Sequence, residues 1–240
     1  MVKGASIKAR EEREGRLLSV VESDISAVDQ VIEALKSGVR EGRYVPGQRL
    51  SEPDMMREFH VSRGSVREAL RCLEADGLVQ IEFYRGARIR KMSRTEFIEA
   101  NQIRGVLEGY AASLAAQSMD AAQRKRFIEL EQNWDRGSKG WTYAQYNERF
   151  HALILEASHN RQLPVHVEQV RLLVFDLQFH RIQRSPKAIK RSRLEHARVV
   201  KAILKGDASG AERAMRQHIE SSGASILSAP ESFFSVEISQ

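Results

Sequence analysis

Three histidines in the second half of the chain have neighbours that could bring them together around a metal ion. His151, His196 and His218 each lie among apolar residues with helical spacing, so we expect their side chains to face a helical core. Asn147 is four residues before His151 and shares its helical face. Three imidazoles and an amide oxygen would suit zinc, nickel or a similar divalent ion, with an open position for a ligand carboxylate. The alternative for each histidine is an ordinary hydrogen-bonded core residue.

Arg104 is a candidate to bind a small carboxylate. It lies near an apolar face of a predicted helix over residues 94–118, where its guanidinium group could hold an anion. The alternative is an ion pair with Glu108, which is one turn away on the same helix. The sequence leaves both interpretations open.

A third group of residues points to nucleic acid. Arg63, Arg67 and Arg71 recur every four residues and form one basic stripe on a predicted helix whose opposite face is apolar. Guanidinium groups can hydrogen-bond guanine edges or phosphates in pairs, and Gly64 and Ser65 near the helix start would allow close approach to DNA. The alternative is that these arginines are only solvated.

The elements around the arginine stripe follow the order of a winged helix-turn-helix. Apolar spacing predicts three short helices, the last of them capped by Ser62. After Gly77 the apolar period shifts toward two, which predicts a β-hairpin with Gly86 at its tip. Arg85 and the other basic residues of this hairpin could contact a phosphate or the minor groove. We therefore predict a winged DNA-binding domain over residues 24–92.

The remainder of the chain, residues 93–228, is predicted to be an antiparallel all-α bundle. Helical spacing and short breaks indicate six helices, at 94–118, 120–136, 142–158, 163–183, 186–205 and 208–228. We expect residues 1–23 to be a polar lead-in and residues 229–240 to be a tail. The predicted fold class is mainly α, with a winged helix-turn-helix followed by the bundle.

Composition excludes several classes of protein. The net charge of +6 would suit a polyanionic partner. Cys72 is the only cysteine, which excludes an internal disulfide and a cysteine-based zinc site within one chain. No run approaches the roughly 20 apolar residues of a membrane helix, and the first residues lack the apolar core of a secretory signal. We expect a cytoplasmic protein with no membrane contact.

Several sequence blocks resemble the winged helix-turn-helix of GntR-type regulators. They are, in order, residues 45–52 (VPGQRLSE), 61–70 (VSRGSVREAL), 73–79 (LEADGLV) and 85–87 (RGA). The DNA-binding residues expected from this resemblance and from the arginine stripe are Arg49, Ser62, Arg63, Gly64, Ser65, Arg67, Arg85 and Gly86. Two departures occur: Pro53 stands where the family usually has an arginine that contacts DNA, and His60 replaces a usual glycine in the turn.

The bundle resembles the FCD domain that accompanies this DNA-binding module in the FadR-like branch. The similar segments are residues 103–108, 147–151, 194–196 and 218–219. In many such domains an aspartate and three histidines hold a divalent metal, and an organic acid binds beside it. The resemblance implies that Asn147, His151, His196 and His218 hold zinc, nickel or manganese, with Asn147 as a weaker donor in the aspartate's place, and that Arg104 binds the effector. Six helices favour the shorter, VanR-like version of the bundle.

These inferences predict a homodimeric repressor with a small carboxylate effector. Two winged domains would bind adjacent half-sites of a double-stranded, palindromic DNA operator, and the effector would favour one arrangement of the wings. An alternative is a metal-dependent enzyme built on the bundle, although only residues 148–151 provide a Glu-x-x-His motif, where di-iron bundles use a pair. Another alternative is a DNA-architectural protein without a sensor.

Overall fold

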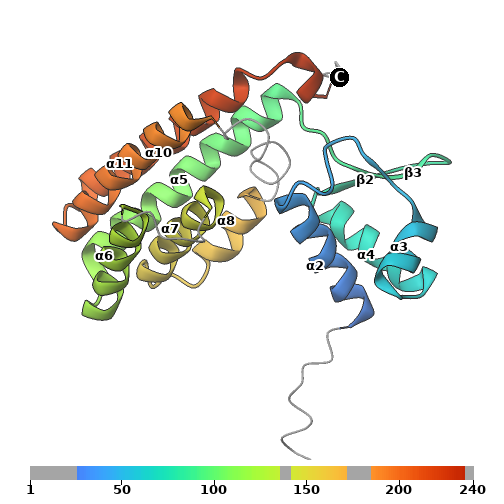
Figure 1. Ribbon diagram of the computed structural model, residues 1–240, viewed down its shortest axis with the longest axis horizontal. Coiled ribbons are helices and arrows are strands. Elements are labelled where there is room, and N and C mark those ends of the chain that lie inside the picture. Colours follow the sequence, from blue (N-terminus) through green and yellow to red (C-terminus); the bar gives the residue numbers. More distant parts are fainter. Residues whose placement is uncertain (1–25, 136–141, 172–184, 236–240) are drawn as a thin grey trace, which may run out of the picture.

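The computed structural model describes residues 26–135, 142–171 and 185–235, which form two domains with separate hydrophobic cores. Figure 1 shows the N-terminal domain at one end of the molecule and the helical bundle at the other. Within these described ranges, no helix combines the length and apolar character needed to cross a bilayer. The predicted lead-in, residues 1–23, lies outside the described residues.

The N-terminal domain folds as the sequence predicts, as a helix-turn-helix followed by a hairpin. Its elements are α2 (Ala27–Arg40), β1 (Arg49–Leu50), α3 (Glu52–Phe59), α4 (Arg63–Ala75), β2 (Val79–Glu82) and β3 (Gly86–Ile89). Strand β3 pairs antiparallel with both β1 and β2, which gives the order β1-β3-β2. The hairpin of β2 and β3 is the wing. The two-residue strand β1 is too short to show an apolar period, so the sequence does not predict it.

The turn between α3 and α4 sets the direction of the second helix. His60 ends α3 in the left-handed conformation, with a φ of 55°. Glycine adopts this conformation at no steric cost, whereas a residue with a Cβ strains the backbone by about 1 kcal/mol. Ser62 then caps α4, because its hydroxyl oxygen accepts a hydrogen bond from the backbone N–H of Ser65 at 3.1 Å.

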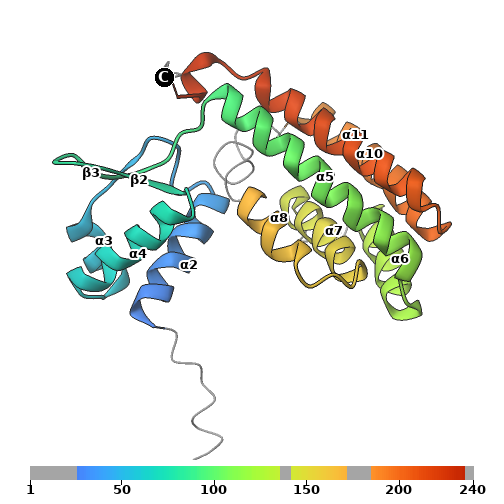
Figure 2. The same ribbon diagram turned by 180° about the vertical axis from the view of Figure 1, so that it is seen from behind.

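The C-terminal domain is the predicted helical bundle. Its elements are α5 (Arg94–Ser118), α6 (Ala121–Asp135), α7 (Tyr143–Ala157), α8 (Leu163–Arg171), α10 (Pro186–Leu204), α11 (Ala208–Leu227) and the 3-10 helix η2 (Glu231–Phe233). Figures 1 and 2 show the long helix α5 running between the pair α10 and α11 on one side and α7 and α8 on the other. The second half of the helix predicted over 163–183 lies outside the described residues, so the count of six helices stays a prediction.

The C-terminal segment, residues 228–235, differs from the predicted tail because it packs against the start of α5. Phe234 is buried, and its ring lies 6.5 Å from that of the buried Phe97. The backbone N–H of Ser235 donates to the carbonyl oxygen of Met92 at 2.8 Å. The two phenylalanines that follow Pro230 supply the apolar surface that holds this segment on the bundle.

Candidate functional site

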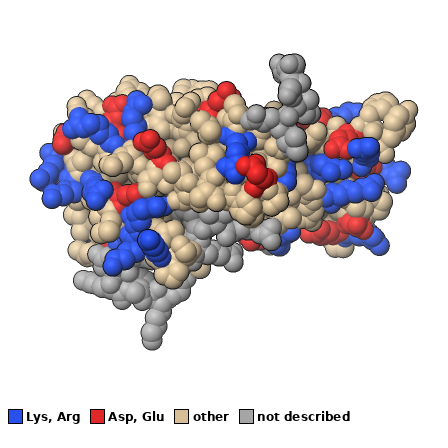
Figure 3. Space-filling model, turned by 90° about the horizontal axis from the view of Figure 1, so that it is seen from above, with Lys and Arg blue, Asp and Glu red and all other residues tan. Residues whose placement is uncertain are grey.

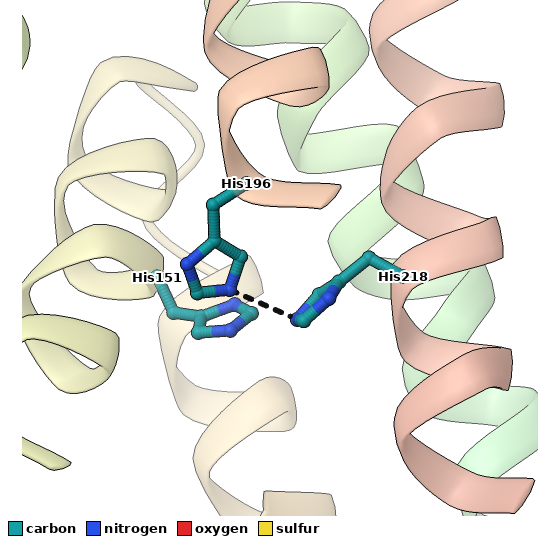
Figure 4. A group of neighbouring side chains, drawn as sticks. All are labelled: His151, His196 and His218. Carbon is teal, nitrogen blue, oxygen red and sulfur yellow. Dashed lines mark hydrogen bonds between the residues drawn. The ribbon is translucent and has the colours of Figure 1, made fainter. Parts of the chain in front are cut away.

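The three histidines predicted from the sequence meet in the core of the bundle. His151 comes from α7, His196 from α10 and His218 from α11, and all three side chains are buried. One ring nitrogen from each lies within 4.8 Å of the others, and the Nε2 atoms of His196 and His218 are 3.1 Å apart. Figure 4 shows the three rings converging from separate helices. We call this group the histidine site.

Two buried carboxylates hold the outer nitrogens of the histidine site. Nδ1 of His151 hydrogen-bonds to Glu108, and Nδ1 of His218 bonds to Oε2 of Glu195 at 3.0 Å. Because a carboxylate accepts, each Nδ1 carries the proton and each Nε2 keeps its lone pair for the centre of the site. Nε2 of His151 is buried and has no hydrogen-bond partner among the described residues. A buried ring nitrogen with an unused lone pair can bind a metal ion, so the three histidines fit a metal site.

Burial keeps the three imidazoles neutral. It lowers the pKa of His151 to about 4, in spite of the opposing effect of Glu108. Burial and the two neighbouring histidines hold the pKa of His196 well below its ordinary value. Burial also lowers the pKa of His218, although the bond to Glu195 opposes it. All three rings are therefore neutral near pH 7, which is the form that binds metal.

Arg104 lies beside the histidine site, through Glu108. Its Nε donates to Oε1 of Glu108 at 2.6 Å, while the other oxygen of the same carboxylate bonds to His151. Burial alone would raise the pKa of Glu108, but Arg104 and His151 outweigh it and hold this pKa well below its usual range. The ion pair considered from the sequence is present. Glu108 is the single side chain that links the buried guanidinium group of Arg104 to the ring of His151.

Asn147 lies on the buried face of α7, one turn before His151. Its Oδ1 accepts a long hydrogen bond, 3.4 Å, from the hydroxyl of Tyr143. The hydroxyl group of Ser192 on α10 lies 2.5 Å from the same tyrosine oxygen. The three histidines thus converge without help from Asn147, and the amide belongs to a polar chain at the edge of their site.

Sequence reasoning missed part of the surroundings of the histidine site. Glu195 was not singled out, because it is adjacent to His196 and therefore points in another direction on α10. The ring of Phe150 stacks on His196 with centroids 3.8 Å apart. Both contacts join different helices, and helical spacing within one segment carries no signal for them.

The predicted DNA-binding arginines are exposed on α4. Nε of Arg63 and Nε of Arg67 each lie 3.9 Å from the carboxylate of Glu52 on α3. Arg71 lies 3.6 Å from Glu68 on its own helix. Exposed pairs of this length are weak, so these guanidinium groups are available to another partner. Seen from above, Lys and Arg side chains gather at the end of the molecule that holds this domain, and also at the far end of the bundle (Figure 3).

The wing brings further basic residues to the same domain. Arg49 on β1 lies opposite Arg88 on β3, and Nε of Arg88 contacts Glu82 at 3.1 Å. Arg85 is largely exposed near the tip. Gly86 has a φ of 82°, which a side chain would strain. The structure therefore places the eight predicted DNA-binding residues on α4, on the turn before it, on the small sheet, or, for Arg85, in the loop between β2 and β3.

Comparisons with known proteins agree with this architecture. Residues 27–89 match the family "Bacterial regulatory proteins, gntR family", and residues 99–221 match the FCD domain. The chain is 29% identical over 194 residues to the HTH-type transcriptional regulator YdhC of Bacillus subtilis, covering 79% of this chain and 84% of YdhC. It is 28% identical over 210 residues to the transcriptional repressor RspR of Escherichia coli, covering 82% and 87%.

A solved structure has a similar fold. It is that of Escherichia coli McbR/YncC, with a TM-score of 0.69, 20% sequence identity, and coverage of 84% of this chain and 97% of that chain. At this identity the likeness concerns the fold alone.

Proposed function

Because the chain belongs to the GntR family of bacterial regulators and carries an FCD domain, it is a DNA-binding transcription regulator, and we propose that it represses transcription under the control of a small carboxylate bound in the bundle. The proposed operator contacts are Arg63 and Arg67 on α4, with Arg85 in the wing. The family and the names of the relatives do not support the alternative of a metal-dependent enzyme.

The observation that carries the sensor proposal is the convergence of three buried, neutral imidazoles. His151, His196 and His218 would hold a divalent ion such as zinc, nickel or manganese, and Glu108 and Glu195 would orient two of the rings. The bound ion would act as a Lewis acid that attracts an anionic oxygen. Asn147 is one turn from His151, so its oxygen is a candidate further donor.

Charge favours a carboxylate as the effector. Arg104 is balanced by Glu108, and Glu195 is the only other buried acid that contacts the described histidines. A divalent ion added to these groups leaves the centre with a net positive charge in a medium of low dielectric constant. A monoanionic organic acid would neutralise that charge, whereas a cation would be repelled.

The outer face of α5 supports a homodimer. Ile103, Val106 and Tyr110 are about half exposed on a helix whose other side is buried in the bundle. Glu99 is the only charged residue that this helix exposes between Ile98 and Ser118. A helix that is apolar all round is usually covered on both sides. We propose that a second copy of the chain covers this face and so brings two winged domains to adjacent half-sites.

The sensor proposal is tested by replacing the three histidines with alanine. Metal content is measured by elemental analysis, and ligand response by the thermal shift that a panel of organic acids produces. We expect the triple variant to lose metal and ligand response while it still binds DNA. His166→Ala is the matched control, because His166 is exposed on α8. An unchanged ligand response in the triple variant would reject the histidine site as the sensor.

A further inference from the structure

The tip of the wing carries two aromatic side chains with almost no contact to the protein. Phe83 is 85% exposed and Tyr84 is 96% exposed. Their rings contact each other edge to face, with centroids 4.6 Å apart and an interplanar angle of 78°. They occupy the loop between β2 and β3, so they do not belong to the core of the domain.

The backbone of this loop also gives no reason for a tyrosine. Tyr84 has a φ of 63°, in the left-handed region where glycine or asparagine is usual in short hairpin loops. A bulky residue there strains the free protein, and its exposed ring gains no burial. Strain of this kind tends to be kept where a binding partner uses the side chain.

The charge around the tip indicates what kind of binding partner would contact the two aromatic rings. The hairpin carries Arg85 and Arg88, and Glu82 is the only acid between residues 79 and 89. Arg90 and Lys91 follow at the base of the hairpin, where Arg90 pairs with Glu96 and Lys91 donates to the carbonyl oxygen of Ser232. This surface would repel a second basic copy of the chain but attracts a polyanion. The minor groove of DNA offers negative charge to the arginines and apolar surface to the aromatic rings, since phosphates line its edges and deoxyribose rings form its walls.

The wing is fixed relative to α4, which makes a shared DNA contact possible. The carboxylate of Glu74 on α4 accepts a hydrogen bond from the backbone N–H of Ile81 on β2 at 2.9 Å. Figures 1 and 2 show the hairpin extending past α3 and α4, away from the bundle. When α4 lies in the major groove, the tip therefore lies over a neighbouring part of the duplex.

We propose that Phe83 and Tyr84 form an apolar contact with the deoxyribose walls of the minor groove beside the α4 site. This inference rests on the proposed binding of an operator by α4, and adds two residues that contribute affinity without charge. Apolar contacts release few counterions, so their contribution does not depend on salt in the way that arginine contacts do.

The test uses the full chain and a duplex selected by the unmodified protein from a random pool of DNA. Affinity is measured over a range of salt concentrations for Phe83→Ala, Tyr84→Asn, the double variant and the matched variant Arg85→Ala. We expect the double variant to bind roughly tenfold to a hundredfold more weakly, with an unchanged slope of log affinity against log salt. Arg85→Ala should reduce the magnitude of that slope by about 0.9.

Two further measurements locate the contact and check folding. Hydroxyl radicals attack deoxyribose from the minor groove, so the protein should protect a flanking segment that the double variant leaves open. Tyr84→Asn should melt at the same temperature or higher, because asparagine tolerates the left-handed backbone.

The proposal is overturned if the double variant keeps full affinity, if its salt slope falls as in Arg85→Ala, or if its only defect is loss of self-association. Failure of the unmodified protein to select any duplex would instead reject the operator contact of α4, on which the proposal rests.

Discussion

Glu108 and His151 share a fully buried hydrogen bond although they lie 43 positions apart in the sequence. The second oxygen of the same carboxylate binds Arg104, so one acid neutralises a buried arginine and orients a histidine. The stability of the bundle and the state of the histidine site therefore depend on the same side chain.

Replacing Glu108 with glutamine should destabilise the bundle strongly. The change leaves the charge of Arg104 buried without its counter-charge, a defect that costs about 3–5 kcal/mol in the free energy of unfolding. Urea denaturation measures this loss. Glu212→Gln is the control, because Glu212 forms the same i,i+4 pair with Arg216 on the exposed side of α11 and should cost about 0.5 kcal/mol or less. Equal losses in the two variants would mean that Glu108 does not balance a buried cation.

Metal-free protein should lose stability as the pH falls from about 6.5 toward 4. An unfolded histidine binds a proton near pH 6.5, whereas burial lowers the pKa of His151 to about 4 in the folded chain. Unfolding therefore takes up protons in this window, and stability is present above pH 6.5 and lost below it. Each buried histidine contributes up to about 1.4 kcal/mol per pH unit.

Urea denaturation at a series of pH values, with a chelator present, measures this slope. His151→Phe should flatten it, and the exposed His166→Ala should not. A slope that is the same in all three proteins would contradict the assignment to the histidine site.

The C-terminal segment should stabilise the start of α5. Arg94 donates to the carbonyl oxygens of Leu227 and Ala229 at 2.5 and 2.9 Å, and its Cζ lies 4.3 Å from the centroid of Phe234. Phe234→Ala should lower the free energy of unfolding by about 3 kcal/mol, because it also uncovers the buried Phe97. Phe83→Ala, at an exposed position, should have no measurable effect. Thermal melting distinguishes the two.

The exposed face of α5 gives a prediction about assembly. Val106→Asp should convert a dimer into monomers, because the charge would be buried against the second copy. Size-exclusion chromatography with light scattering measures the mass. Val165→Asp is the control, since Val165 is exposed to a similar degree on α8. Dimers that survive Val106→Asp would place the interface elsewhere.

The sequence predicted the features that arise within single segments. Apolar periods of 3.6 and 2 residues located α4 and the wing, and they showed that His151, His196 and His218 face inward. Contacts between segments were harder to predict, because they depend on how one helix is rotated against another. The bond from Glu195 to His218 is of this kind, and so is the packing of Phe234 on Phe97.

Helix α5 runs without a break from Ser93, which caps it beside the wing, past Glu108 at the histidine site. At 1.5 Å per residue, roughly 21 Å separates Glu108 from Arg94. Because the helix is continuous over this length, a tilt of about 5° at Glu108 would move its N-terminal end at Ser93 by roughly 2 Å. In the proposed dimer, the same tilt of α5 in each copy would change the distance between the two winged domains enough to mismatch a fixed pair of half-sites.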